Sequence, residues 1–146
     1  MTAARFRKRY PGVKVSVSVP RELLWVPMDV ILIEQVLTNL LENAVIHGKT
    51  TTEIHMGAER AKGHVRFFVA DNGQGIAPAD MERLFDGSMK HSETAAGDMK
   101  RNMGIGLSVC MAVVKAHDGT MNAKNRENAP GAEFEFYLPL EEEHQK

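Results

Sequence analysis

Four polar residues recur at intervals of four along one otherwise apolar segment. They are Gln35, Asn39, Asn43 and His47. Because a helix makes a turn in about 3.6 residues, this spacing places them in one file on a helix. Solvated helix faces normally use Lys and Glu, and asparagine is a mediocre helix former, so the file favours a function. Asparagine carbonyls are neutral oxygen ligands that suit Mg²⁺, which takes its other ligands from water and phosphates.

An acidic residue and two glycines follow a second apolar segment. Asp71 comes directly after residues 65–70 and opens the sequence Asp-Asn-Gly-Gln-Gly. A carboxylate at the end of a strand can accept a hydrogen bond from the exocyclic amino group of adenine. Gly73 and Gly75 permit positive φ and a close approach of the backbone to a planar base. Taken alone, the motif fits an ordinary tight turn equally well.

A third motif, Gly104-Ile105-Gly106-Leu107, follows a long polar segment. We expect it to open a helix, whose unpaired N–H groups and positive dipole end would attract a polyphosphate. A lone G-x-G fits a simple helix start equally well, so the combination of three motifs favours nucleotide binding. The sequence His47-Gly48-Lys49-Thr50 is no P-loop, because Asn43 stands where that motif needs a glycine. The six histidines show no metal-binding spacing, and nothing local supports a Ser-His-Asp triad.

Hydrophobic periodicity predicts the elements that carry these residues. Alternating valines between residues 13 and 19 predict a strand, and apolar residues at helical spacing predict a helix from Asp29, its N-cap, to His47. The further predicted elements are strands at 52–58 and 64–71 joined by a hairpin at 62–63, a short helix from 78 to 85, a helix from about 104 to 117, and strands at 120–125 and 132–138. This order predicts a two-layer α/β sandwich with one mixed sheet and helices on one face.

The remaining segments are polar. Residues 86–103 have few large apolar side chains and no periodicity, and polar segments longer than about 12–15 residues are usually functional or disordered. We therefore expect a mobile lid. Residues 1–12 are expected to be a solvated linker and residues 141–146 a disordered tail, which leaves 13–140 as the domain.

Bulk composition excludes several functions. A chain of 146 residues is most simply one domain, and its net charge of -1 gives no field that would attract nucleic acid or an anionic membrane. The single cysteine, Cys110, lies in an apolar segment and is interpreted as a small buried hydrophobic residue in a reducing compartment. Neither a membrane-spanning run nor a signal sequence is present, so we expect a cytoplasmic segment without direct membrane contact.

The motifs, in this order, resemble the ATP-binding domain shared by sensor histidine kinases and the gyrase, Hsp90 and MutL superfamily, which has the Bergerat fold. EQVLTNLLENAV resembles the N box, DNGQGI the first glycine box, RLFDG a short phenylalanine box, and GIGLS the second glycine box. The resemblance covers residues 13 to 139. Within the family, NLLENAV and the Asn-Arg pair before the final strand are most similar to the potassium-responsive KdpD sensor kinases.

The resemblance implies a site for ATP and Mg²⁺. Asn43 would bind the metal, Asn39 would be the catalytic position beside the phosphates, and Asp71 would bind the adenine amino group. The other implied residues are Gly73, Gly75, Ile76 and Leu107 around the base, His47 where many relatives have a tyrosine beside the adenine, Gly104 and Gly106 at the phosphates, and Phe85 as the anchor of the lid.

Three positions depart from the family pattern. Many relatives have a lysine where this chain has Ile46, and Lys90, Lys100 or Arg101 of the lid would have to replace it. Asn102 stands where the second glycine box often has a further glycine. Glu133 stands where a threonine is common before the last aromatic strand.

The residue four positions before Asn43 indicates the reaction. Relatives that hydrolyse ATP typically have a glutamate base there, but Asn39 cannot accept a proton at neutral pH, so ATP is expected to be held for transfer. No histidine stands in the family's acceptor motif. The resemblance thus implies the catalytic domain of a protein histidine kinase, excised from a membrane-anchored sensor. Its partners would be the histidine-containing dimerisation domain of the same kinase and a response regulator.

Two alternatives remain open. One is a stand-alone anti-sigma-factor-type serine kinase, which would bind a transcription factor; the segment NAVIHG is similar to that group, although Asn39 and the kinase-like C-terminal segment argue against it. The other is a degenerate regulator that binds nucleotide without catalysis, for which Ile46 and Asn102 are the motivation.

Overall fold

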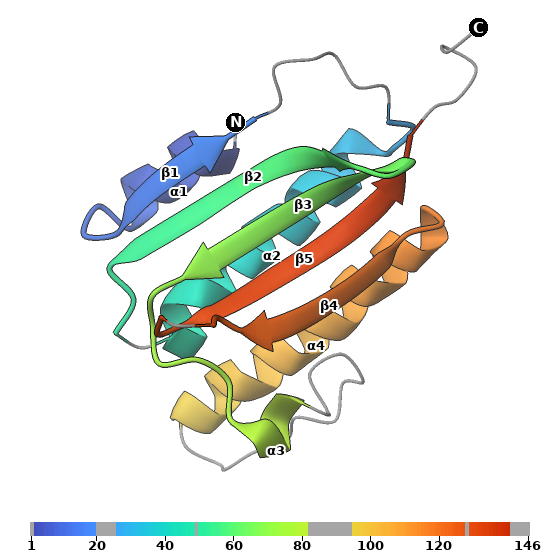
Figure 1. Ribbon diagram of the computed structural model, residues 1–146. Helices are drawn as coiled ribbons and strands as arrows, with labels where there is room; N and C mark the ends of the chain where they lie inside the picture. Colours follow the sequence, from blue (N-terminus) through green and yellow to red (C-terminus); the bar gives the residue numbers. More distant parts are fainter. Residues whose placement is uncertain (1, 20–25, 49, 82–94, 128, 141–146) are drawn as a thin grey trace, which may run out of the picture.

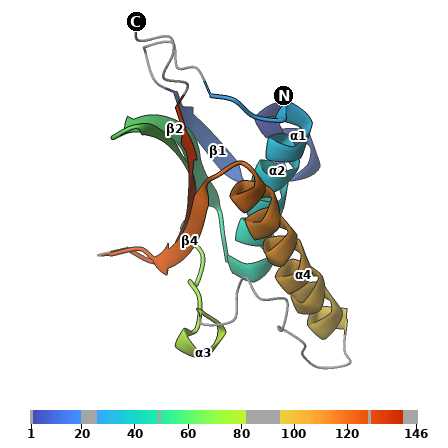
Figure 2. The same ribbon diagram turned by 90° about the vertical axis from the view of Figure 1, so that its right-hand side faces the viewer.

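A computed structural model of the chain describes residues 2–19, 26–48, 50–81, 95–127 and 129–140. These residues form a five-stranded sheet, and helices cover one of its faces (Figure 1 and Figure 2). In chain order the elements are α1 (Thr2–Arg9), β1 (Lys14–Ser18), α2 (Val30–Gly48), β2 (Glu53–Ala61), β3 (His64–Asp71), α3 (Pro78–Met81), α4 (Ala95–Ala116), β4 (Thr120–Asn125) and β5 (Ala132–Pro139). None of the described helices is long and apolar enough to cross a membrane.

The sheet has the strand order β1-β2-β3-β5-β4. Strands β1 and β2 are parallel and are connected through α2, as parallel neighbours require a crossover. The other neighbouring pairs are antiparallel, and β2 and β3 form the expected hairpin. The prediction of a two-layer sandwich with one mixed, mostly antiparallel sheet is therefore confirmed.

Helix α2 joins the two layers because one of its sides is apolar. Asp29 caps its first turn and accepts a hydrogen bond from the Leu32 N–H at 3.1 Å, as the sequence predicts. Leu40 and Leu41 have no exposed surface. They share a core with residues of the sheet and of α4, including Ile54, Val69, Leu107, Cys110, Val114, Phe134 and Phe136. Since burying one such large side chain contributes about 1.5–3 kcal/mol, this core fixes α2 relative to β3 and β5.

The N-terminal residues differ from the predicted linker. Residues 2–9 form α1, and its Phe6 is buried and lies against Tyr10 with the ring centroids 4.9 Å apart. Arg9 pairs with Glu42 of α2 at 3.0 Å. The basic side chains of α1 from Arg5 onward are exposed, as expected. Phe6, the aromatic residue among these basic side chains, nevertheless packs α1 on the core.

Helix α4 begins earlier than the sequence predicts. We expected a helix from about Gly104, whereas α4 starts at Ala95, so residues 95–103 of the predicted lid are helical. These residues include alanine, methionine, lysine and arginine, whose high helix propensity offsets a cost of about 1 kcal/mol for each interior glycine. The other residues assigned to the lid, 86–94, and the tail 141–146 lie outside the described residues.

A histidine near the end of α4 holds the beginning of α2. Nε2 of His117 accepts a hydrogen bond from the Asp29 N–H at 3.0 Å, so this nitrogen carries no proton. The proton therefore sits on Nδ1, which donates to the Val113 carbonyl at 2.8 Å. The ring links the start of α2 to the end of α4.

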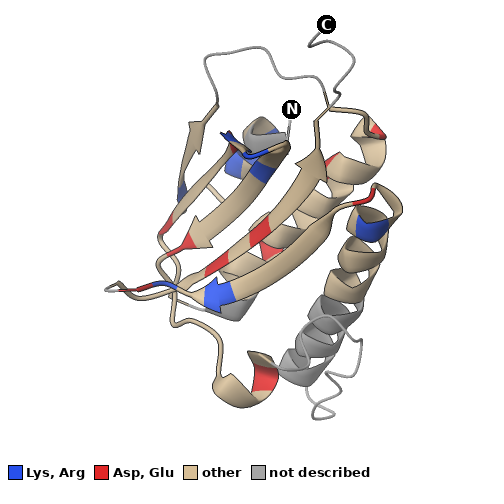
Figure 3. Ribbon diagram, turned by 45° about the vertical axis from the view of Figure 1, so that its right-hand side comes forward, with Lys and Arg blue, Asp and Glu red and all other residues tan. Residues whose placement is uncertain are grey.

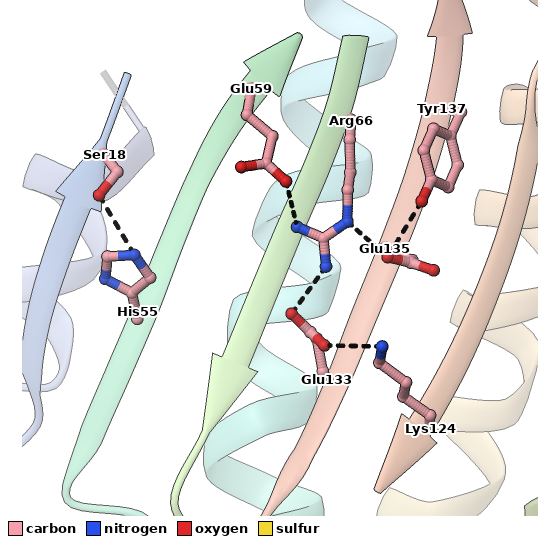
Figure 4. A network of polar contacts seen from close by, with 8 residues as sticks. All are labelled: Ser18, His55, Glu59, Arg66, Lys124, Glu133, Glu135 and Tyr137. Carbon is pink, nitrogen blue, oxygen red and sulfur yellow. Dashed lines mark hydrogen bonds and ion pairs between the residues drawn. The ribbon is translucent and has the colours of Figure 1, made fainter. Parts of the chain in front are cut away.

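The face of the sheet that the helices leave open carries a network of charged side chains (Figure 4). Arg66 of β3 donates to Glu135 at 2.6 Å and to Glu133 at 2.8 Å, both on β5. It also contacts Glu59 of β2 at 3.2 Å. Burial alone would lower the pKa of Arg66, but the hydrogen bonds and charges of the two β5 carboxylates raise it above its ordinary value. The guanidinium therefore stays charged and ties three strands together.

Charge of both signs continues toward the edge of this face. Figure 3 shows acidic positions on β5 and a basic position at the end of β4. Lys124 of β4 pairs with Glu133 at 3.5 Å (Figure 4). Further along the sheet, His55 of β2 bonds Ser16 and Ser18 of β1 through its two ring nitrogens, at 2.9 and 3.2 Å.

Candidate nucleotide-binding site

The predicted site residues come from elements that meet at one end of the sandwich. Strand β3 ends there at Asp71, β4 ends at Asn125, β5 begins at Ala132, and the C-terminal end of α2 lies beside them (Figure 1). Helix α2 packs against both β3 and α4. The topology thus brings the amides of α2, the Asp71 turn and the glycines of α4 to the same end of the molecule.

Asp71 is a buried carboxylate held by backbone donors. Only 3% of its surface is exposed. Its Oδ1 accepts hydrogen bonds from the Gly73 N–H at 2.8 Å and from the Ala132 N–H at 3.4 Å. These bonds fix the direction of the carboxylate, and a carboxylate has about four lone-pair sites, so it can accept an adenine amino group as a further donor.

The two glycines after Asp71 have different roles. Gly75 has a φ of 82°, as the sequence predicts. A Cβ at this position would lie 2.8 Å from Oδ1 of Asn125, so a larger residue would be strained by the backbone conformation and would also shift the Asn125 side chain. The prediction of positive φ was wrong for Gly73. The carboxylate of Asp71 closes the turn at that point by accepting the Gly73 N–H, so a left-handed backbone is not needed there.

The connection between β4 and β5 contacts the turn that begins at Asp71. The sequence did not predict this contact. Gly131 has a φ of 111°, and a Cβ on it would lie 1.9 Å from the carbonyl oxygen of Asp71. Arg126 donates to the same carbonyl oxygen at 3.1 Å. Nothing local in the sequence indicated that Gly131 packs on Asp71.

Glu133, which replaces the common threonine, lies away from the Asp71 carboxylate. The register of β3 and β5 pairs Ala70 with Glu133, which places Ala132 opposite Asp71. Glu133 instead binds Arg66 on the open face of the sheet. The donor that β5 gives to Asp71 is therefore a backbone N–H, which does not depend on the side chain at position 133.

The side chain of Asn43 is buried and carries a donor without an acceptor. Its side chain is 6% exposed, and its Nδ2 has no hydrogen-bond partner. Leaving a buried donor without an acceptor costs about 1–3 kcal/mol, so such an atom in a folded domain calls for an explanation. A phosphate oxygen would satisfy Nδ2, and Oδ1 is the kind of neutral ligand that Mg²⁺ accepts.

Asn39 lies one helical turn before Asn43 and faces α4. Its Nδ2 donates to Sγ of Cys110 at 3.6 Å. Its Oδ1 is 3.6 Å from the point that a Cβ on Gly106 would occupy. Asn39 and Gly106, which the sequence assigns to the same site from distant segments, are therefore neighbours in the fold.

Residues 28–142 match the protein family described as histidine kinase-, DNA gyrase B-, and HSP90-like ATPase. The chain belongs to this family. Its curated relatives include sensor protein KdpD of Clostridium acetobutylicum, 36% identical over 94% of this chain, and KdpD of Escherichia coli, 35% identical over 88%. The resemblance to KdpD sensor kinases is thus confirmed. This chain spans only 15% and 14% of the length of these two relatives.

Solved structures of histidine kinases have the same fold as this ATPase-family domain. The nucleotide-free catalytic domain of histidine kinase ThkA matches 94% of the chain with a TM-score of 0.75 and 28% identity, and 87% of that domain is covered. Full-length ShkA in complex with AMPPNP matches 95% of the chain with a TM-score of 0.74 and 28% identity, and 28% of that protein is covered. These relatives favour an ATP-binding kinase domain over the anti-sigma-type serine kinase.

The second glycine box of the family does not open a helix in this chain. Gly104 and Gly106 lie in the interior of α4, where backbone N–H groups pair within the helix. The unpaired N–H groups of α4 belong to its first turn, at residues 95–98. The expected phosphate cradle at a helix start is therefore wrong for this conformation, and contact of these glycines with phosphates stays a prediction.

The remaining predicted residues divide into buried and undescribed ones. Ile76 is 3% exposed and Leu107 has no exposed surface, and both belong to the hydrophobic core. Their contact with adenine stays a prediction. Phe85 and Lys90 lie outside the described residues, and the described part of the chain does not include the side chains of His47, Lys100 and Arg101.

Cys110, the neighbour of Asn39, makes stability depend on alkaline pH. Burial raises the pKa of its thiol to about 11, although the hydrogen bond from Asn39 acts in the opposite direction. The thiol of the unfolded chain ionises at about 8.5, so stability is complete below that pH and is lost as pH rises through the folded value. Relative to a Cys110→Ala variant, the parent should lose on the order of 3 kcal/mol of unfolding free energy over this interval. Urea denaturation at a series of pH values measures the difference, and parallel pH profiles would contradict the prediction.

Proposed function

We propose that this chain is the catalytic, ATP-binding domain of a two-component sensor histidine kinase. It binds Mg-ATP and donates the γ-phosphoryl group to a histidine of a separate dimerisation domain, from which an aspartate of a response regulator receives it. The domain acts on the cytoplasmic side of a membrane-anchored sensor.

The observation that carries the proposal is the Nδ2 of Asn43, which is buried without a hydrogen-bond partner, in a family of histidine kinase-, DNA gyrase B-, and HSP90-like ATPases. In the proposed site its Oδ1 binds Mg²⁺ and its Nδ2 donates to a phosphate oxygen. Asp71 accepts the adenine amino group, while its fixed backbone contacts keep the carboxylate in one orientation. Asn39 contacts the phosphate region from the preceding turn of α2.

Transfer rather than hydrolysis follows from the residue types in the site. Asn39 lies where a base would have to act on water, but its amide has no proton-accepting group at neutral pH. The amide is also held in place by its bond to Cys110. Phosphoryl transfer depends mainly on positioning and on neutralising phosphate charge, to which Mg²⁺ held by Asn43 would contribute.

Phosphotransfer in trans tests the proposal. The domain is mixed with the cognate histidine-containing dimerisation domain and γ-labelled ATP, and acid-labile label on the dimerisation domain is measured over time. We expect transfer by the parent, transfer reduced on the order of 100-fold by Asn43→Ala, and parental transfer by Thr38→Ala, an exposed position on the same helix. ATP binding without any transfer would identify a degenerate regulator, and label on a serine of another protein would favour the anti-sigma type.

A further inference from the structure

Asn125, the last residue of β4, makes two hydrogen bonds to one residue of the turn that follows Asp71. Its Oδ1 accepts the N–H of Ile76 at 2.7 Å, and its Nδ2 donates to the carbonyl of the same residue at 2.9 Å. The amide therefore pairs with Ile76 as one rung of a β-ladder would. Exchanging the oxygen and nitrogen of the amide would oppose donor to donor, so one orientation of the side chain is fixed.

The turn is shaped to receive this amide. Gly75 has positive φ, and a Cβ on it would lie 2.8 Å from Oδ1 of Asn125. Any larger residue at position 75 would displace the amide from Ile76. The glycine of the turn and the asparagine of β4 therefore fit each other.

The residue after Asn125 holds the opposite end of the same turn. Arg126 donates to the carbonyl of Asp71 at 3.1 Å, and its own N–H donates to the carbonyl of Gly131 at 2.9 Å. Gly131 in turn packs directly on the Asp71 carbonyl. Two consecutive residues thus hold the first and last residues of the segment 71–76.

We propose that Asn125 is a positioning residue of the nucleotide site, which holds the turn 71–76 in the shape that directs the Asp71 carboxylate to adenine. Oδ1 of that carboxylate bonds Gly73 within the turn, so a displaced turn rotates or releases it. Hydrogen bonds weaken steeply when their angles change, and the adenine amino group would lose affinity while the phosphate contacts on α2 persist. The inference rests on the proposed function, because it concerns the same site.

Comparison of two purine nucleotides separates positioning from general stability. Competition titrations would give the affinities of the parent, Asn125→Ala and Asn122→Ala for ADP and for IDP, which lacks the amino group. Asn122 is an exposed asparagine on the same strand. We expect Asn125→Ala to bind ADP about tenfold more weakly, since two hydrogen bonds are lost, with little change for IDP. Asn122→Ala should match the parent for both nucleotides.

An aspartate at position 125 gives a pH readout that a purely structural role would not. At about pH 8 the carboxylate of Asn125→Asp still accepts the Ile76 N–H, but its second oxygen faces the Ile76 carbonyl, so ADP binding should be at least as weak as in Asn125→Ala. At about pH 4 roughly half of the carboxyl is protonated and can donate to that carbonyl as the amide did, so affinity relative to the parent should recover several-fold. If Asn125→Ala does not fold, the pH series of Asn125→Asp alone tests the proposal.

The outcomes are distinguishable from failure of the proposed function. A parent domain that does not bind ADP would refute the nucleotide site itself. A parent that binds ADP, together with an Asn125→Ala variant of equal ADP-to-IDP preference, would overturn only the positioning role. A pH-independent defect in Asn125→Asp would overturn it as well, whereas reduced ADP preference with recovery in acid supports it.

Discussion

Replacing Asp71 by asparagine should weaken the binding of adenine nucleotides roughly 100-fold while the domain still folds. The amide oxygen can still accept the Gly73 N–H, so the turn keeps its internal hydrogen bond. The new NH₂ group, however, opposes a donor to the donor of adenine in a buried position, which costs about 2–4 kcal/mol, or roughly 100-fold in affinity. Calorimetric titration with ADP measures the loss, and thermal unfolding confirms that the variant is native.

An aspartate outside the site provides the matched control. Asp118 is exposed and has a φ of 62°, a conformation that asparagine also adopts readily, so Asp118→Asn should bind ADP like the parent. An Asp71→Asn variant with parental ADP affinity would remove Asp71 from the adenine site. It would leave the fold assignment untouched.

Replacing Asn43 by leucine should stabilise the ligand-free domain and at the same time destroy its response to Mg-ATP. The Nδ2 of Asn43 is buried without an acceptor, so an apolar side chain with the same branching removes a desolvation cost of about 1–2 kcal/mol. The parent should gain stability when Mg-ATP binds, whereas the variant should not, because the stabilisation depends on the affinity for the folded state. Chemical denaturation with and without Mg-ATP measures both effects.

A second leucine variant shows whether burial is the cause. Thr38 is exposed on α2, so Thr38→Leu fills no buried position and should not stabilise the domain beyond its small gain in helix propensity. Loss of stability in Asn43→Leu would show that the amide contributes to the folded state without a ligand. The interpretation of Asn43 as a residue that binds Mg-ATP would then be wrong.

The elements that the sequence predicted well are those with a local signal. The strand His64–Asp71 and the helix that starts after Asp29 have apolar periodicity and flanking turn or cap residues, and both were located to within a residue or two. Helix α1 was missed because Phe6 alone, among basic residues, gives no period. The start of α4 was missed because its first residues are helix formers without an apolar stripe.

The residues of the candidate site also divide into those with a local signal in the sequence and those without one. Asn43 and Asp71 were predicted from residue type and spacing, and both are buried; their contact with nucleotide stays a prediction. Asn125 could not be found in this way, because its partner Ile76 is 49 residues away in the chain. Such a contact depends on the register of β3, β5 and β4, which no local pattern determines.

One histidine of the domain is prevented from competing for the phosphoryl group. An imidazole attacks phosphorus through an in-plane lone pair on a ring nitrogen, and a neutral ring has one such pair. In His117 that pair is on Nε2 and is occupied by the Asp29 N–H, while Nδ1 is committed to Val113. To become phosphorylated, this ring would have to release the cap residue of the helix that carries Asn43. His117 also lies at the N-terminal end of α2, whereas Asn43 follows Asp29 by 14 residues, roughly 20 Å along the helix, so in the proposed kinase this ring is far from the phosphates that Asn43 would contact.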